Sequence, residues 1–459
     1  MEKLDIPGAA LVVVRVEGVV HAKGYGRVSE DGGEVTPQTP IPLASITKSV
    51  TALVVMRLVE SGQLELDAPV QRYLPWFRVA DPDASADITL RHLLSQTSGL
   101  STLSGRLSFG STDISREALA EATRELAEED LVAEPGTEFH YSNSNFTVLG
   151  AILEAVSGRT YEELVEEEVF APLGMGRSFI SVPAAEAHGM AGMHQYFFGR
   201  VVPVENLPYS RRVLPLGGLV SSAADLGRFA RVLLNGGSLD GTRIISAEGV
   251  QEMFQPEVQI QDRVFYGLGW LIADVDPSRR VFHGGDGEGF TGTIALFPEE
   301  GWGYVVLINA NSYSSGPNFQ QLKQAVEKVL RGQEPAEVAP TIFIAPVIGL
   351  AALLFVQLIA AARTIFLLRR WRRHPDRRPR KAWIRWGWHV GLPLLASATI
   401  AVGVLVLLPH MFEIRLQGML LFAPDVGYLV VAIGSIAIIW GILRTILVVR
   451  SLRSRTPRH

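Results

Sequence analysis

The chain has 459 residues and a net charge of −5, so it is long enough for two or three domains and too weakly charged to suggest a nucleic-acid partner. It contains no cysteine, which excludes disulfides, zinc sites built from thiolates and cysteine nucleophiles. Acidic residues are frequent in the N-terminal part, whereas long apolar runs and clustered arginines follow residue 340.

The first predicted elements form a β-hairpin. Residues 9–16 are an apolar run typical of a strand, a turn follows at Glu17-Gly18, and residues 19–25 can pair back. This opening does not have the form of a signal peptide, because its apolar run is short and is flanked by charged residues.

A buried helix is predicted to begin around Ser45 and to end before Gly62, which suits a C-terminal cap. Ser45 and Lys48 are three residues apart and therefore share one face of the first turn. Burial lowers the pKa of a lysine, and a neutral amine can accept a proton from a hydroxyl group. The alternative is an ordinary helix start with a solvated lysine, because Ser-x-x-Lys occurs by chance roughly a couple of times in a chain of this length.

The middle of the chain is predicted to be mostly helical, and the last part of this region returns to strands. Helices are predicted at 90–94, 117–129, 146–156 and 161–169, a surface loop at 101–111, strands at 267–272, 280–284, 291–297 and 304–309, and a final helix at 318–330. This order predicts an α+β fold, in which an antiparallel sheet is flanked by helices, its first strands pair with its last ones, and a mostly helical subdomain is inserted between them.

Two more polar segments are candidates for a site. In Tyr141-Ser142-Asn143, the phenol can relay a proton and the amide can bond to a substrate amide. His283-Gly284-Gly285 ends a predicted strand, and its glycines allow another backbone to come close. Each segment also has an ordinary explanation. Tyr141 can be a half-buried aromatic residue, His283 a histidine at a strand end, and Gly284-Gly285 a turn.

In this order, the three segments resemble the motifs of the serine β-lactamase and penicillin-binding protein superfamily. The similar branch is the class C β-lactamase-like one, with its DD-peptidases, D-aminopeptidases and esterases. Further landmarks extend the resemblance over about residues 5–330: Ile6-Pro7-Gly8, Gly24-Tyr25-Gly26, the stretch 93–100, Pro135-Gly136, the stretch 172–175, Gly217-Gly218-Leu219 and the stretch 266–270. The resemblance implies a β-lactamase/transpeptidase-like fold and no metal or organic cofactor.

The resemblance also implies catalytic roles. Ser45 is expected to be the acylated nucleophile, Lys48 to share or accept its proton, and Tyr141 to act as general base or acid. The oxyanion hole is expected from the backbone N–H groups of Ser45 and Asp286. The reaction is acyl transfer in two steps, in which an acyl-enzyme forms and water then hydrolyses it.

Substrate binding is expected to involve Asn143, His283, Gly284 and Gly285. His283 stands where many β-lactamases have a lysine, and a histidine is mostly neutral at pH 7. The fixed cation for a substrate carboxylate is thereby weakened, which favours a peptidase or an esterase over an efficient β-lactamase.

A membrane domain is predicted after the hydrolase domain. The hydrolase is expected at 1–331, a linker at 332–340 and the membrane domain at 341–459, with spans at about 341–362, 387–408 and 426–443. Each span is close to the roughly 20 apolar residues that cross a bilayer, and none contains Asp, Glu, Lys or Arg.

The arginine-rich loop 369–385 and the basic C-terminal tail are expected on the cytoplasmic side, which places the hydrolase domain and the 409–425 loop outside. The export of residues 1–340 needs a signal ahead of them, so we expect the natural chain to have a longer N-terminus. The expected partners are the lipid bilayer and a small-molecule or peptide substrate such as cell-wall peptide, with no nucleic acid.

The sequence therefore predicts a membrane-anchored serine hydrolase acting on D-amino-acid peptides, esters or β-lactams. One alternative is a non-hydrolytic penicillin-binding or peptidoglycan sensor that signals through its spans. Another is a transport protein with an accessory domain, which is disfavoured because His389 is the one ionisable residue inside the predicted spans.

Overall fold

The computed structural model describes residues 1–205, 209–275, 278–312, 316–335, 344–379 and 381–453. The chain divides into two compact units, Met1–Thr341 and Ile342–His459. Of the predicted linker 332–340, residues 336–340 lie outside the described residues, as do the first three residues of the first predicted span.

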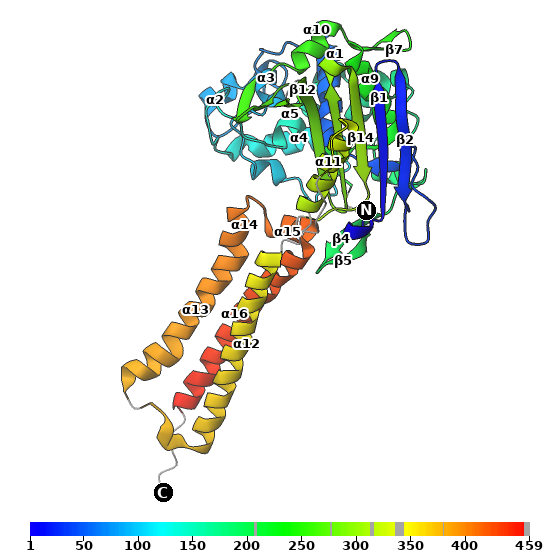
Figure 1. Ribbon diagram of the computed structural model, residues 1–459. Coiled ribbons are helices and arrows are strands. Elements are labelled where there is room, and N and C mark those ends of the chain that lie inside the picture. Colours follow the sequence, from blue (N-terminus) through cyan, green and yellow to red (C-terminus); the bar gives the residue numbers. More distant parts are fainter. Residues whose placement is uncertain (206–208, 276–277, 313–315, 336–343, 380, 454–459) are drawn as a thin grey trace. The chain divides into compact units, whose positions relative to one another are not determined.

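An eight-stranded antiparallel sheet forms the centre of the first unit (Figure 1). Its strand order is β2-β1-β14-β13-β12-β11-β10-β9. The strands are β1 (Gly8–Arg15), β2 (Gly18–Gly26), β9 (Val258–Gln261), β10 (Val264–Tyr266), β11 (Leu271–Val275), β12 (Ser278–Gly287), β13 (Phe290–Phe297) and β14 (Trp302–Ile308). Because β1 pairs with β14 from Ala9↔Ile308 to Arg15↔Trp302, the prediction that the first strands pair with the last ones is confirmed.

The predicted strand 267–272 is wrong. β10 ends at Tyr266 and β11 begins at Leu271, and the residues between them turn the chain. Gly269 has a φ of +77°, which few residues other than glycine adopt. The Gly267 N–H donates to the Trp270 carbonyl at 2.8 Å, which closes the turn.

The inserted part of the first unit is mostly helical, as predicted. Its helices are α1 (Thr47–Glu60), α2 (Pro82–Asp87), α3 (Leu90–Leu94), α4 (Ala118–Arg124), α5 (Ser144–Ser157), α6 (Tyr161–Val165), α7 (Ala171–Leu173) and α8 (Val182–Glu186). α1 is buried on nearly all sides, and Gly62 follows its end with a φ of +74°, as its role as a cap requires.

Residues 101–111 do not form the exposed loop that the sequence suggested. Most of them are half-buried, and Ser104 is buried. A Cβ added to Gly105 would lie 2.4 Å from the Asn143 nitrogen, so this segment packs directly against the loop that carries Tyr141. The serines and glycines of this segment led to the prediction of an exposed loop, but their small size instead allows the segment to pack closely.

Two helices cover opposite faces of the sheet. Alternation along β1 places Val12 in one core and Val13 in the other. α9 (Ala223–Leu234) packs on the first face, where its Gly227 lies close to Val12. α11 (Gly316–Leu330) covers the second face through Phe319. α1 and the catalytic candidates belong to the α9 side.

The remaining regular elements of the first unit are short. Besides single helical turns, they include α10 (Ala247–Met253) and three two-stranded sheets: β3 (Pro40–Pro42) with β6 (Val220–Ser222), β4 (Met193–Phe197) with β5 (Arg200–Val204), and β7 (Ser238–Leu239) with β8 (Thr242–Arg243). The β3–β6 pair fixes the segments just before Ser45 and just after Gly218 next to each other.

The second unit contains three helices that are long and apolar enough to cross a membrane: Ala345–Arg373, Ile384–Met411 and Pro424–Arg453. They correspond to α12 (Ile344–Arg373), to a helix that includes α13 (Leu392–Val402) and α14 (Leu408–Met411), and to α16 (Pro424–Arg453), while α15 (Leu416–Phe422) is a short helix before α16. All three extend beyond the predicted spans. Arg444 therefore lies inside α16, where it donates to Thr364 Oγ1 at 3.1 Å and to the His389 carbonyl at 2.8 Å.

Candidate active site

Ser45 lies in a single helical turn, Ala44–Ile46, that leads directly into α1. Ala44 has a φ of +45°, an uncommon conformation for a residue with a side chain. Strain of this kind concentrates at functional sites. The turn lies against β12, because a Cβ added to Gly285 would come within 2.0 Å of the Leu43 carbonyl oxygen. The nucleophile candidate is thus held between the sheet and the start of α1.

Lys48 is fully buried one turn later. Its Nζ donates to the Leu216 carbonyl at 2.6 Å and lies 3.0 Å from Ser45 Oγ. The rings of Tyr141 and Phe146 lie 5.2 and 5.5 Å from the same nitrogen. Burial lowers the pKa of Lys48 well below its ordinary value, which favours the neutral amine. A neutral amine in this position can accept the Ser45 proton.

Tyr141 completes a direct hydrogen-bonded group. Its OH donates to Ser45 Oγ at 2.9 Å, from the loop that precedes α5. Ser45 Oγ therefore contacts the Lys48 amine and the Tyr141 phenol at once. These three residues, which lie as much as 96 positions apart in the chain, are the ones that the sequence singled out as nucleophile and bases.

Gln96 holds the Tyr141 loop, and sequence reasoning gave it no role. Its Oε1 accepts from the Ser142 N–H at 2.9 Å and from Asn145 Nδ2 at 2.6 Å, and its carbonyl accepts from the His140 N–H at 2.9 Å. Gln96 is fully buried and has a φ of +63°. Its place within the landmark 93–100 was the available signal, but the partner of a buried amide cannot be read from spacing.

His283 is almost completely buried in β12 and does not touch Ser45 in a described contact. Its Nδ1 lies 2.7 Å from the Gly284 carbonyl oxygen, which can only accept, so Nδ1 carries the proton. Nε2 then accepts from the Tyr266 OH at 3.1 Å. Burial lowers the pKa of His283 to about 3. The imidazole is therefore neutral at physiological pH.

Tyr266 links His283 to the serine group. Its ring meets the Tyr141 ring edge-on with centroids 6.5 Å apart. Burial raises the pKa of Tyr266 well above its ordinary value, so its phenol stays protonated and can donate to His283. The sequence marked Tyr266 as a landmark but gave it no function.

The end of β12 offers a free backbone edge. β11 pairs with β12 as far as Leu271↔Phe282, whereas β13 continues beside β12 to Gly287↔Phe290. From His283 to Gly287, one edge of β12 therefore has no strand partner among the described residues. A Cβ at Gly284 would have its nearest neighbour, the Gly292 carbonyl oxygen, at 3.9 Å, so a small side chain would fit there without a clash.

Asn143 and Asp286 lie close to this group in the fold but differ in environment. The Asn143 Oδ1 is buried and has no hydrogen-bond partner within the described part of the chain. The Asp286 side chain is more than half exposed and accepts from Thr291 Oγ1 at 2.6 Å. The Asn143 Oδ1 is thus an acceptor without a described partner, whereas the Asp286 carboxylate already accepts a hydrogen bond.

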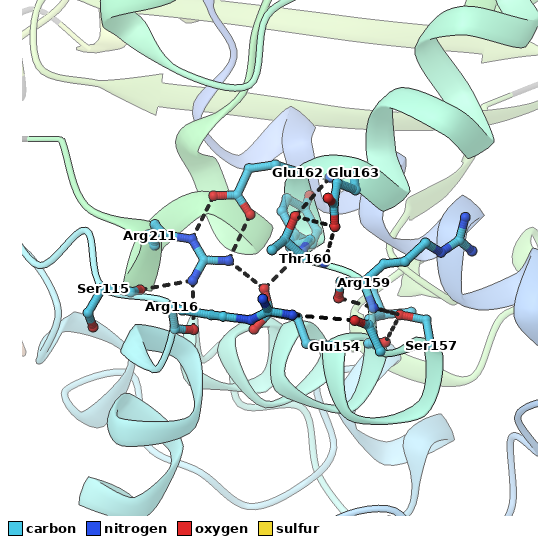
Figure 2. A network of polar contacts seen from close by, with 12 residues as sticks. Ser115, Arg116, Glu154, Ser157, Arg159, Thr160, Glu162, Glu163 and Arg211 are labelled. Carbon is cyan, nitrogen blue, oxygen red and sulfur yellow. Dashed lines mark hydrogen bonds and ion pairs between the residues drawn. The ribbon is translucent and has the colours of Figure 1, made fainter.

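A buried ion network supports the segment that presents the Leu216 carbonyl to Lys48 (Figure 2). Arg211 donates through Nε and Nη2 to both oxygens of Glu162, at 2.6 and 2.8 Å, and also to Glu154 Oε1. Its Nη1 donates to the carbonyls of Ser115 and Arg116 at 2.9 and 2.7 Å. Figure 2 shows the guanidinium enclosed by these acceptors.

The turn Leu214–Gly218 begins three residues after Arg211 and faces α1. The Thr51 hydroxyl donates to the Pro215 carbonyl at 2.8 Å and lies 2.7 Å from the Tyr161 OH. The Arg211 network therefore fixes one end of the turn and Thr51 fixes its middle.

Residues 1–326 match the protein-family model described as Beta-lactamase. The chain belongs to the β-lactamase family. Members of this superfamily are generally serine hydrolases, and the antiparallel sheet with flanking helices is the fold that the sequence predicted.

Named relatives agree with this assignment. Penicillin-binding protein 4 of Amycolatopsis lactamdurans is 30% identical over 321 residues, which are 68% of this chain and 82% of that protein. Protein flp of Staphylococcus aureus (strain COL) is 29% identical over 315 residues, and the chain spans 61% of its length. Among solved structures, the octameric penicillin-binding protein homologue from Pyrococcus abyssi has a TM-score of 0.64 at 29% identity and covers 76% of this chain and 79% of its own.

Proposed function

We propose that the protein is a membrane-anchored serine hydrolase that works through an acyl-enzyme on Ser45. The observation that carries the proposal is the convergence of a buried amine and a phenol on one hydroxyl, with Lys48 Nζ at 3.0 Å and Tyr141 OH at 2.9 Å from Ser45 Oγ. The substrates are D-amino-acid peptides, esters or β-lactams.

The proposed reaction has two steps. Ser45 Oγ attacks the substrate carbonyl while Lys48, kept neutral by burial, accepts its proton. Tyr141 passes a proton to the leaving group, and the backbone N–H groups of Ser45 and Asp286 stabilise the oxyanion. Water then attacks the acyl-enzyme and gives a proton to the Tyr141 oxygen, and Lys48 returns its proton to Ser45 Oγ as the bond between the acyl carbon and Oγ breaks.

The environment of His283 supports a peptide or an ester over a β-lactam. A neutral imidazole already bonded to Tyr266 offers no positive charge to a substrate carboxylate. The Asn143 Oδ1, which has no partner among the described residues, can accept from a substrate amide N–H, and the edge of β12 from His283 to Gly287 that pairs with no described strand can bind an extended substrate. Relatives named as penicillin-binding proteins are compatible with a cell-wall peptide as the natural substrate.

The proposed location is a bilayer that the three long helices of the second unit cross. Basic residues of the loop 369–385 and of the tail, such as Arg373 and Arg450, face the cytoplasm by the positive-inside rule. An odd number of spans then places the hydrolase unit on the outer side, next to extracellular substrates.

The test is turnover by the full chain in detergent micelles. The wild type, Ser45→Ala and Ser61→Ala are incubated with nitrocefin, a p-nitrophenyl ester and a D-Ala-D-Ala peptide. Ser61 lies at the far end of α1 and bonds locally to the Leu58 carbonyl, so it is the matched control. We expect turnover of at least one substrate by the wild type and Ser61→Ala, and a loss of about 10³-fold or more in Ser45→Ala.

Two outcomes would contradict the proposal. Retention of wild-type turnover by Ser45→Ala would remove the nucleophile from the mechanism. Acylation of one equivalent followed by no further release would instead favour the sensor alternative.

A further inference from the structure

Lys323 is a second buried lysine, and the proposed reaction gives it no role. It lies on α11 with a side chain that is 4% exposed. Its Nζ donates to Thr291 Oγ1 at 2.7 Å and to the Gly292 carbonyl at 3.2 Å, both on β13. A lysine is rarely buried unless a partner offsets its desolvation.

The partner is the carboxylate of Asp286. Lys323 Nζ lies 4.0 Å from Asp286 Oδ1, and Thr291 bridges the two, because its hydroxyl accepts from Lys323 and lies 2.6 Å from the same Oδ1. Burial lowers the pKa of Lys323, whereas the Asp286 charge acts in the opposite direction and favours the ammonium form.

Alternation along β12 separates the two functions of Asp286. Gly285 faces the Leu43 carbonyl on the α1 side, so the next side chain points to the opposite face, where Lys323 lies. The backbone N–H of Asp286 is the proposed oxyanion donor. The Asp286 carboxylate is therefore a fixed negative charge on the same residue as the N–H group at which the oxyanion forms.

We propose that Lys323 is a positioning residue for acyl transfer, whose ammonium, with Thr291, holds and offsets the Asp286 carboxylate behind the oxyanion hole. This inference rests on the proposed function. Without Lys323, the uncompensated carboxylate opposes formation of the tetrahedral intermediate. In a partly buried site, one unit charge at such a distance changes a rate by about tenfold or more.

The test compares Lys323→Met, Asp286→Asn and the double variant in the full chain, with the substrate that the wild type turns over. The acylation rate constant is measured by stopped flow, together with KM and the Tm. We expect Lys323→Met to slow acylation about tenfold with KM changed less than about twofold. The double variant is expected to recover to within about threefold of the wild type, because it lacks the carboxylate as well.

Asp286→Asn is a second test that does not depend on the folding of Lys323→Met. The Asp286 side chain is 58% exposed, so its substitution should not disturb folding. It is expected to acylate faster than the wild type, by about two- to fivefold, because the Lys323 charge is then unopposed. The proposal is overturned if the double variant is as slow as Lys323→Met, which would assign Lys323 a packing role, or if Asp286→Asn is slower than the wild type. These outcomes are distinct from failure of the hydrolase proposal, which is decided by the turnover of the wild type and of Ser45→Ala.

Discussion

Replacing Arg211 by methionine removes one guanidinium from a buried group of acceptors while keeping most of the side-chain volume. The Arg211 side chain is 7% exposed, and those of Glu154 and Glu162 are 17% and 26% exposed. The substitution therefore leaves two poorly solvated carboxylates beside each other. Burial already raises the pKa of Glu154 above its ordinary value, and without Arg211 its charge keeps the Tyr161 N–H, 2.9 Å from Oε1, but loses its cationic partner.

The expected loss of stability follows from this burial. Removing one partner of a buried ion pair costs about 3–5 kcal/mol. Because the two carboxylates keep some contact with water, we expect the lower end, about 3 kcal/mol. In a domain of this size, about 1 kcal/mol shifts the Tm by roughly 2–4 °C, so the Tm should fall by about 6–12 °C.

The assay is thermal unfolding of the full chain in detergent, followed by tryptophan fluorescence, because Trp270 is fully buried in the hydrolase unit. The matched control is Arg72→Met. Arg72 also pairs with a carboxylate at short range, 2.6 Å from Glu65 Oε2, but the two side chains are 53% and 61% exposed. Exposed pairs contribute little, so this control should shift the Tm by less than about 1 °C.

A second variant separates charge from packing. If the unpaired carboxylates cause the loss, Arg211→Met with Glu154→Gln should recover about half of it, since one negative charge is gone. Equal Tm values for Arg211→Met and the Arg72 control would refute the reasoning. So would a double variant no more stable than Arg211→Met, because the cost would then lie in packing alone.

Four further outcomes are expected. Tyr141→Phe should lower kcat by about 10²–10³-fold with little change in KM, and a kcat within threefold of wild type would remove Tyr141 from proton transfer. Burial lowers the pKa of His283 in the folded chain to about 3, so below about pH 6.5 the unfolded chain binds a proton that the folded chain does not. The free energy of unfolding should therefore fall as the pH drops below about 6.5, by up to about 1.4 kcal/mol per pH unit. The Tm of His283→Gln should decline less steeply over the same pH range. Gly285→Ala should lower the Tm by several degrees through its clash with the Leu43 carbonyl, whereas Gly284→Ala should leave it within about 1 °C. A reporter fused after Lys381 should read as cytoplasmic, and an external signal would reverse the proposed topology.

The sheet and the serine group could be predicted because their signals are local or carried by motifs. Apolar alternation and turns marked β1, β13 and β14 to within two residues at each end. Ser45 and Lys48 lie one helical turn apart, so their contact follows from helix geometry alone. Tyr141 came from the family resemblance, which stands in for a contact that spans 96 residues.

The supporting contacts could not be predicted, because polar residues give no periodic signal for a distant partner. Gln96 and Arg211 look in the sequence like solvated side chains, yet both are buried and hold backbone segments of the site. The strand predicted at 267–272 failed for a related reason. Its apolar residues pack around a glycine turn that Gly269 permits, and residue type alone did not reveal the reversal.

The pairing of β1 with β14 has a consequence for the order of events during synthesis. Ala9 pairs with Ile308, so this edge of β1 has no partner until almost the whole hydrolase unit has been synthesised. The central sheet cannot close before then. Contacts so distant in the chain slow folding and leave an apolar strand edge open to other chains. The first helix that is long and apolar enough to cross a membrane, α12, begins at Ile344, soon after that strand. In the proposed membrane-anchored protein, completion of the sheet and insertion of the anchor therefore fall within the same short interval of translation, and a delay in closing the sheet leaves its open strand edge exposed at the membrane surface.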